Sequence, residues 1–233
     1  MTNQSDPLGF PIHALTNGVP IVGQPIHASV HKRVRTHLLG QRTEDGIWPP
    51  HSQVAGAVEA YGTAHAYLYE SLDPVAAARF YEKATALDEG YLQAWVGLAL
   101  AWTSMGTPDS LESAIQLWQA LIDLPVGDNG VSRRCMGILL QNLGYSLFQQ
   151  HLYTHDLPTL KSAATYYQQA STMEDDIRPE LYFPWCNVLM LLGQETDAGE
   201  IWSRAGLGTL GPVKDVYLDK YADLSALDLR WSK

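Results

Sequence analysis

The chain has 233 residues, of which 46% are apolar and 17% charged, and its formal net charge is −10. No stretch approaches the ~18 to 20 consecutive apolar residues that a transmembrane helix requires, so we expect no membrane span. The acidic balance disfavours binding to nucleic-acid phosphates. The first residues lack the basic and apolar segments of a secretory signal, and we expect a cytoplasmic protein.

Residues 1–50 are expected to form a partly irregular N-terminal arm. Four of the 13 prolines lie before residue 26. Within the arm, residues 28–41 place Val30, Val34 and Leu38 at helical spacing, which predicts a short amphipathic helix. This helix carries most of the only basic cluster in the chain, which comprises His31, Lys32, Arg33, Arg35 and Arg42. The cluster has only four permanent charges and no interleaved aromatic residues, so it does not predict nucleic-acid binding.

From Ser52 onward the chain alternates predicted helices with short turns. Ser52 is the expected N-cap of the first helix. The second helix is expected over residues 74–87, because Pro74 suits the first helical position. The apolar stripe of the first helix is predicted to contain Val54, Ala57, Val58, Tyr61, Ala64 and Leu68.

One pattern of bulky and small residues recurs four times along these helices. Its copies begin 34, 45 and 42 residues apart. They read Tyr61-x2-Ala64-His65-x2-Leu68, Trp95-x2-Leu98-Ala99-x2-Trp102, Leu140-x2-Leu143-Gly144-x2-Leu147 and Tyr182-x2-Trp185-Cys186-x2-Leu189. Each copy is followed by a second helix with a shorter signature, namely Ala77-x3-Tyr81, Ala114-x3-Trp118, Ala163-x3-Tyr167 and Ala198-x3-Trp202.

This pattern resembles the tetratricopeptide repeat (TPR) family, whose signature is W-x2-L-G-x2-Y followed by A-x3-F. The resemblance covers about residues 52–206 and implies an all-α solenoid of about four helical hairpins. The resemblance also implies that Trp95 and Trp102 pack between repeats. The expected organisation is an arm at 1–50, a repeat domain at 51–206 and a C-terminal capping helix at 207–233.

The irregular spacing implies insertions between and within the hairpins. We expect the extra residues in turns at 107–111 and 151–158 and in the connection around 125–132. Such turns are places where repeat proteins carry specificity. The two cysteines, Cys135 and Cys186, lie among apolar residues of predicted helices, and we expect two free, buried thiols.

The resemblance also implies a binding groove, because in this family the first helix of each repeat lines a concave face that holds a peptide or a partner's helix. The positions carried over are Glu59, Tyr69, Glu70, Gln93, Val96, Leu100, Gln141, Tyr145, Phe148, Phe183, Asn187 and Met190. None is Lys or Arg, which argues against a clamp for a partner's C-terminal carboxylate. The set suits an apolar or amphipathic segment, with glutamates to meet basic groups. An alternative is that residues 1–50 or the C-terminal helix fill this surface internally.

Two further types of site find weaker support. His151, His155 and Asp156 lie together in a predicted turn and are candidate metal ligands, but no fourth ligand is indicated. The sequence Gly206-x-Gly208-x-x-Gly211 matches a dinucleotide-binding fingerprint by letter only, since a helix and not a strand precedes it. No nucleophile with a marked base, and no paired carboxylates, indicates catalysis.

The sequence therefore predicts a non-catalytic protein–protein interaction module, such as an adaptor, an assembly factor or a dedicated chaperone. Its expected partner is a protein or peptide, with no nucleic acid, no membrane and no cofactor. One alternative is an accessory protein that binds a metal or small ligand through the His-bearing turn at 151–156. A third is an enzyme subunit. No feature of the sequence sets an oligomeric state.

Overall fold

The computed structural model describes residues 52–126, 131–173 and 179–204. Within these ranges the chain forms eight helices and no strand, apart from an isolated bridge between Val126 and Val131. The expected all-α class is confirmed for this part of the chain. The predicted arm at 1–50, the capping helix at 207–233 and the glycine-rich stretch at 206–211 lie outside the described residues. The helices are α2 (Ala55–Tyr69), α3 (Pro74–Leu87), α4 (Leu92–Met105), α5 (Pro108–Ile122), α6 (Arg133–Thr154), α7 (Leu157–Met173), α8 (Pro179–Leu191) and α9 (Glu195–Arg204).

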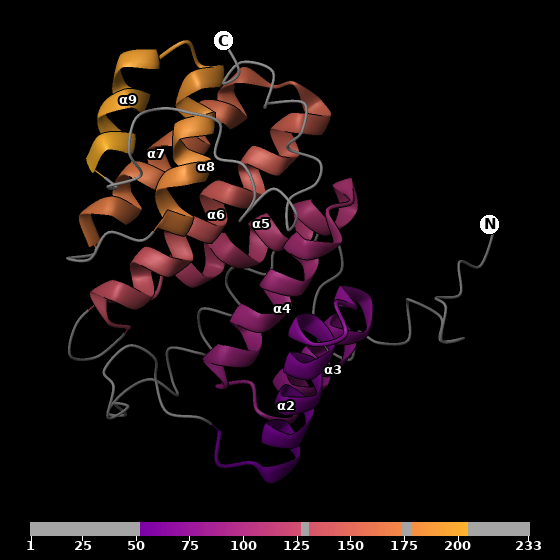
Figure 1. Cartoon of the computed structure of the whole chain (residues 1–233). Helices are drawn as coiled ribbons and strands as arrows, with labels where there is room; N and C mark the ends of the chain where they lie inside the picture. The colour runs from indigo at the N-terminus through magenta and orange to yellow at the C-terminus, as the bar shows by residue number, and fades with distance from the viewer. Residues whose placement is uncertain (1–51, 127–130, 174–178, 205–233) are drawn as a thin grey trace.

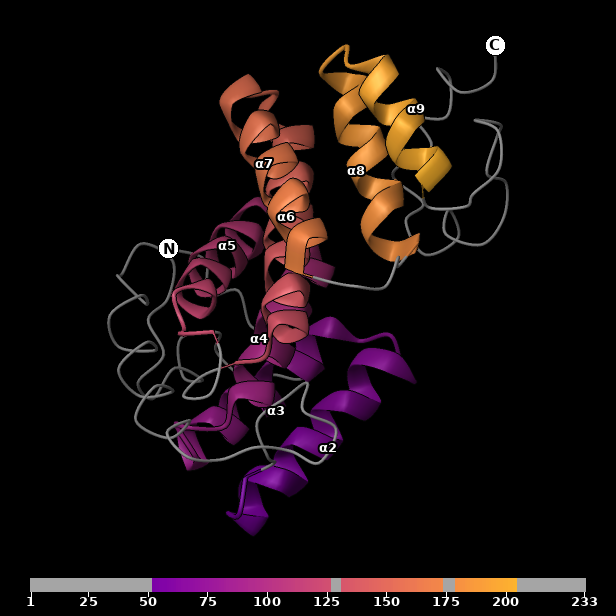
Figure 2. The ribbon, with the colours of Figure 1, turned by 90° about the vertical axis from the view of Figure 1, so that its left-hand side faces the viewer.

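Neighbouring helices in the sequence are also neighbours in space. Each helix packs against the next one along the chain, and α2, α4, α6 and α8 form a second series in which each contacts the following member. The helices therefore progress from α2 and α3 at one end of the molecule to α8 and α9 at the other (Figures 1 and 2).

The start of α3 agrees with the prediction from sequence. The Asp73 side chain accepts a hydrogen bond of 2.9 Å from the backbone N–H of Ala76, and Pro74 occupies the first turn. A proline is tolerated there because the first N–H groups of a helix have no intrahelical acceptor.

The start of α2 differs from the prediction. The helix begins at Ala55 with Val54 as its N-cap, so the assignment of Ser52 as N-cap is wrong. Instead, the buried Ser52 hydroxyl accepts a hydrogen bond from the Val54 N–H and donates one to the carboxylate of Asp88. Ser52 thus ties the start of α2 to the residue that follows α3.

Two of the three predicted insertions take a different form, because most of residues 107–111 and 151–158 extend helices, whereas the connection around 125–132 falls between α5 and α6 as predicted. Thr107 and Ser110 form a capping box that starts α5 at Pro108. Helix α6 continues to Thr154, and His155 ends it in the left-handed conformation with φ of 53°. The Asp156 carboxylate then accepts from the Thr159 N–H at 2.9 Å. Both prolines of these turns lie in the first turn of a helix, where their rings cause no clash.

The core is continuous through α4 and its neighbours. Trp95, Leu98 and Ala99 are buried as predicted. Gly97 allows α3 and α4 to approach closely, since a Cβ atom at this position would lie 2.2 Å from the Tyr81 ring. Trp102 differs from Trp95 because it is only partly buried. Close packing of this kind leaves little tolerance for added volume.

A buried polar network joins α4, α5 and α6. The indole Nε1 of Trp118 donates to the Thr103 hydroxyl at 3.2 Å, and the hydroxyls of Thr103 and Ser146 are 2.9 Å apart. All three side chains are buried. Their hydrogen bonds satisfy polar atoms that would otherwise destabilise the core.

Both cysteines are free and buried, as predicted. Burial raises the pKa of the Cys135 thiol, and it raises the pKa of Cys186 to about 12. The Cys186 Sγ atom lies 3.4 Å from the backbone carbonyl oxygen of Ala198, so this thiol packs between α8 and α9. Neither thiol is available as a nucleophile at neutral pH.

Candidate functional site

The residues predicted to line the concave face lie on α2, α4, α6 and α8, which contact one another in that order. Those on α2 are accessible, since Glu59 and Glu70 are exposed and Tyr69 is 52% exposed. Leu100, Gln141, Tyr145 and Met190 are partly buried. The side chain of Phe183 lies outside what the structure describes.

The remaining four predicted residues have little accessible surface. Phe148 is fully buried and belongs to the main core, and Gln93, Val96 and Asn187 are also buried. Tyr145 lies at the edge of this set, where its hydroxyl accepts a hydrogen bond of 2.9 Å from the Gln149 amide. Helical spacing placed these residues on the expected helices, and four of them have little surface available to a partner.

The His-bearing segment is a helix end and not an extended turn. His151 lies in the last turn of α6, and its Nδ1 atom is 2.8 Å from the backbone carbonyl oxygen of Asp156. The rings of His151 and His155 are 6.3 Å apart between centroids. Hydrogen bonds from Thr159 lower the pKa of the exposed Asp156 carboxyl. Among the described residues there is no group of three or more His, Cys, Asp or Glu side chains placed to hold a metal ion.

A groove of about 990 Å³ lies between α7 and the α8–α9 hairpin. We call it the α7/α9 groove. One wall is a face of α7 that includes Lys161, Thr165, Gln168 and Thr172. These residues follow one another at intervals of three or four, so they share one side of the helix.

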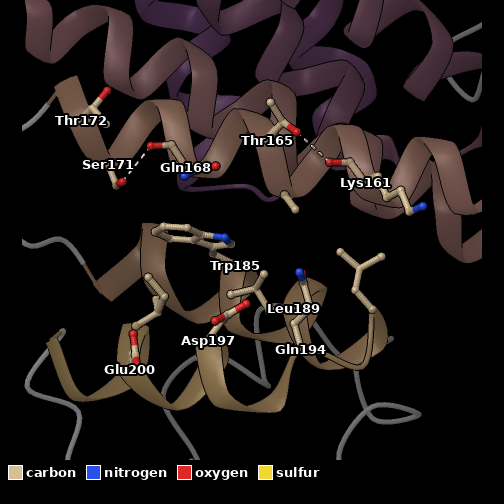
Figure 3. A pocket seen from close by; sticks show the side chains of 13 residues that line it. Lys161, Thr165, Gln168, Ser171, Thr172, Trp185, Leu189, Gln194, Asp197 and Glu200 are labelled. Carbon is tan, nitrogen blue, oxygen red and sulfur yellow. Dashed lines mark hydrogen bonds between the residues drawn. The ribbon is translucent and has the colours of Figure 1, made fainter.

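The opposite wall comes from α8 and α9. Trp185 and Leu189 of α8 are nearly buried and provide apolar surface, while Asp197 and Glu200 of α9 are exposed. Figure 3 shows Trp185 between α7 and the hairpin, with the two carboxylates across the groove from Gln168. The groove therefore combines a smaller apolar floor with polar and acidic edges.

The sequence contained part of the signal for this groove. The α7 helix has a polar face broader than a helix packed on all sides would show, and Asp197 and Glu200 are three apart on the polar side of α9. No pattern indicated that the two faces lie opposite each other, because that depends on how closely α7 and α9 approach.

No known protein family matches this sequence, and no curated protein is significantly similar to it. The resemblance to TPR proteins therefore rests on the residue pattern alone. None of the helices in the described ranges has both the length and the apolar character needed to cross a membrane.

Proposed function

We propose that this protein is a non-catalytic, TPR-like interaction module that binds an amphipathic, basic segment of a partner protein in the α7/α9 groove. The observation that carries the proposal is the groove itself, with its apolar floor and its two exposed carboxylates. An adaptor, an assembly factor or a dedicated chaperone would use such a site.

The repeat architecture is supported by the order of the helix contacts. Each hairpin packs on the next, and alternate helices α2, α4, α6 and α8 contact in series. Helical-hairpin repeats stack in this way because no single hairpin buries its own apolar face. In such an array a gap between two hairpins exposes surface that the other hairpins bury.

The dimensions of the groove suit a short peptide segment. Its α7 wall extends from Lys161 to Thr172, a rise of about 16 Å at 1.5 Å per residue. That length matches about three turns of a bound helix or about five residues of an extended strand. The volume of about 990 Å³ is at the upper end of the range for small-molecule pockets, about 300 to 1,000 Å³, so it is the length of the α7 wall that favours a peptide.

The charges of the groove select the partner's chemistry. Asp197 and Glu200 lie on the same wall, and Lys161 is the only basic residue among those that line the groove in the described chain. A partner with apolar residues for Trp185 and Leu189 and with Lys or Arg for the carboxylates would be complementary. We therefore expect the partner to bind in the α7/α9 groove and not on the concave face, because four of the concave-face residues are buried.

A peptide-display selection on the full chain, followed by fluorescence anisotropy of the selected peptides, tests the proposal. We expect selected peptides to be amphipathic and basic. Gln168→Arg, which places a bulky cation in the groove, should weaken binding by about tenfold or more. Asp197→Asn combined with Glu200→Gln should also weaken it and should reduce its dependence on salt.

Two matched controls distinguish the groove from the rest of the surface. Gln169→Arg adds the same side chain to the adjacent exposed position, which does not line the groove. Glu195→Gln removes a charge from another exposed position of α9 outside the groove. Selected peptides that bind the groove variants as tightly as the controls would show that the α7/α9 groove is not the site.

A further inference from the structure

Exposed apolar side chains are concentrated at the α2–α3 end of the molecule. Of the nine large apolar residues that are exposed in the described ranges, six lie between residues 54 and 87. They are Val54, Val58, Tyr69, Leu72, Val75 and Leu87. Exposed apolar residues that are scattered singly require no explanation, but a concentration at one end of the molecule marks a contact surface.

On α2 these residues continue the buried face around the helix. Ala57, Ala64 and Leu68 are buried against α3 and α4, the helices that α2 contacts. Val58, His65 and Tyr69 each follow one of them in the sequence, which places them about 100° further around the helix. We call these three residues the α2 stripe. The apolar band of α2 is therefore wider than the face that its described neighbours cover.

The side chains of the α2 stripe follow one another along the helix. The rings of His65 and Tyr69 are 4.4 Å apart between centroids, and Tyr61 lies 6.3 Å from His65. Val58 is 40% and Tyr69 52% exposed. Gly62 lies between them on the same side, with no atom within 4 Å of the position of a Cβ, so the middle of the stripe is open. A shallow gap flanked by aromatic rings suits the apolar edge of a second helix.

We infer that the α2 stripe is the docking site of residues 28–41 of the same chain. This inference is independent of the proposed function of the α7/α9 groove. Residues 28–41 carry Val30, Val34 and Leu38 at helical spacing. A connection of known length joins this apolar edge to the start of α2 at Ala55.

Charge complementarity favours this occupant over a second copy of α2. Residues 28–41 contain three Lys or Arg and no Asp or Glu. The α2 helix and its C-cap contain Glu59 and Glu70 and no Lys or Arg. Two α2 helices facing each other would bring like charges together on chains that each carry a net charge of −10, which opposes self-association.

The connecting chain is long enough for residues 28–41 to fold back. Ser52 and Val54 are held at the start of α2, and the remaining residues 42–51 span up to about 33 Å when extended. The α2 helix has 15 residues and is therefore about 22 Å long. This span exceeds the length of α2, so the connection is long enough for residues 28–41 to reach the α2 stripe.

The labelling rate of an introduced thiol tests the inference in the full chain. Gly62→Cys places a small thiol within the α2 stripe and leaves its side chains intact, while the two native thiols are buried. We expect this thiol to react slowly with a maleimide reagent. Combining it with Val34→Asp and Leu38→Asp should increase the rate by about tenfold or more, because the apolar edge of residues 28–41 is lost.

Three controls decide the outcome. Ser29→Asp with Thr36→Asp adds the same charge on the other side of residues 28–41 and should leave the rate at Gly62→Cys unchanged. Ser162→Cys reports on an exposed position of α7 and should not respond to either arm variant. Protection of Gly62→Cys that disappears on 100-fold dilution would indicate a second copy and overturn the inference. Equal rates with both arm variants, or a parallel increase at Ser162→Cys, would also overturn it.

Discussion

Two junctions between successive hairpins differ in how closely their helices approach. Between α3 and α4 the Tyr81 ring rests on Gly97, where even one additional carbon would clash. Between α7 and the α8–α9 hairpin there is a groove of about 990 Å³ with polar edges. The first junction buries an aromatic ring against backbone, whereas the second exposes polar side chains to solvent. Under the proposed repeat architecture, the closed junction supplies stability and the open one leaves surface for a ligand.

The largest expected effect comes from removing a ring from the closed part of the molecule. Trp118 is fully buried and bonds to Thr103, so Trp118→Ala should lower the free energy of unfolding by about 3 to 5 kcal/mol. Trp102→Ala should cost less, because Trp102 is only partly buried. Urea denaturation followed by circular dichroism measures both. Equal losses would contradict the difference in burial.

Glycine substitutions should have opposite effects at two helical positions. Gly97→Ala should destabilise the protein by about 2 kcal/mol, because overpacking against Tyr81 outweighs the better helix propensity of alanine. Gly62→Ala on α2 meets no atom within 4 Å and should stabilise by about 0.5 to 1 kcal/mol. If Gly97→Ala were also stabilising, the α3–α4 junction would be looser than described.

Glu82 on α3 should make the stability of the closed region depend on pH. Burial raises the pKa of Glu82 on α3 to about 8, partly opposed by Arg79. Between pH 4.5 and pH 8 the unfolded chain loses the Glu82 proton while the folded chain keeps it, so the contribution of Glu82 to stability falls as the pH rises through this window. Glu82→Gln does not titrate. Its stability relative to the parent should therefore increase from pH 5 to pH 8, by about 1 kcal/mol or more.

Thermal unfolding across this pH range measures the effect of Glu82. Glu200→Gln makes the same substitution at an exposed position of the α7/α9 groove and is the matched control. A difference between Glu82→Gln and the parent that stays constant with pH would contradict the burial of a protonated Glu82.

The smallest effect on stability is expected in the open junction. Gln168→Arg changes an exposed groove residue and should alter the free energy of unfolding by no more than about 0.5 kcal/mol. The same substitution is expected to weaken peptide binding, so it should lower the affinity for the peptide while leaving the stability nearly unchanged. A large loss of stability would show that the groove closes against α8 in solution.

Part of the architecture followed directly from local sequence signals. The Asp73-Pro74 pair placed the start of α3, and helical spacing identified the burial of Trp95, Leu98 and Ala99. These features depend on residues within one or two helical turns, where backbone geometry is nearly fixed. The turns were less predictable, since Pro108 and Pro158 are compatible both with a turn and with the first turn of a helix.

The sequence by itself determined where most of the described helices lie and which side of each is apolar, because the 3.6-residue period leaves a clear pattern. Only the tertiary structure decided what covers each side. Phe148 and Val96 had the spacing of groove residues but are buried, whereas the polar faces that carry Gln168 and Glu200 form a groove only because the two helices lie opposite each other. The distance between two helices depends on side chains far apart in the chain, as the contact of Gly97 with Tyr81 illustrates.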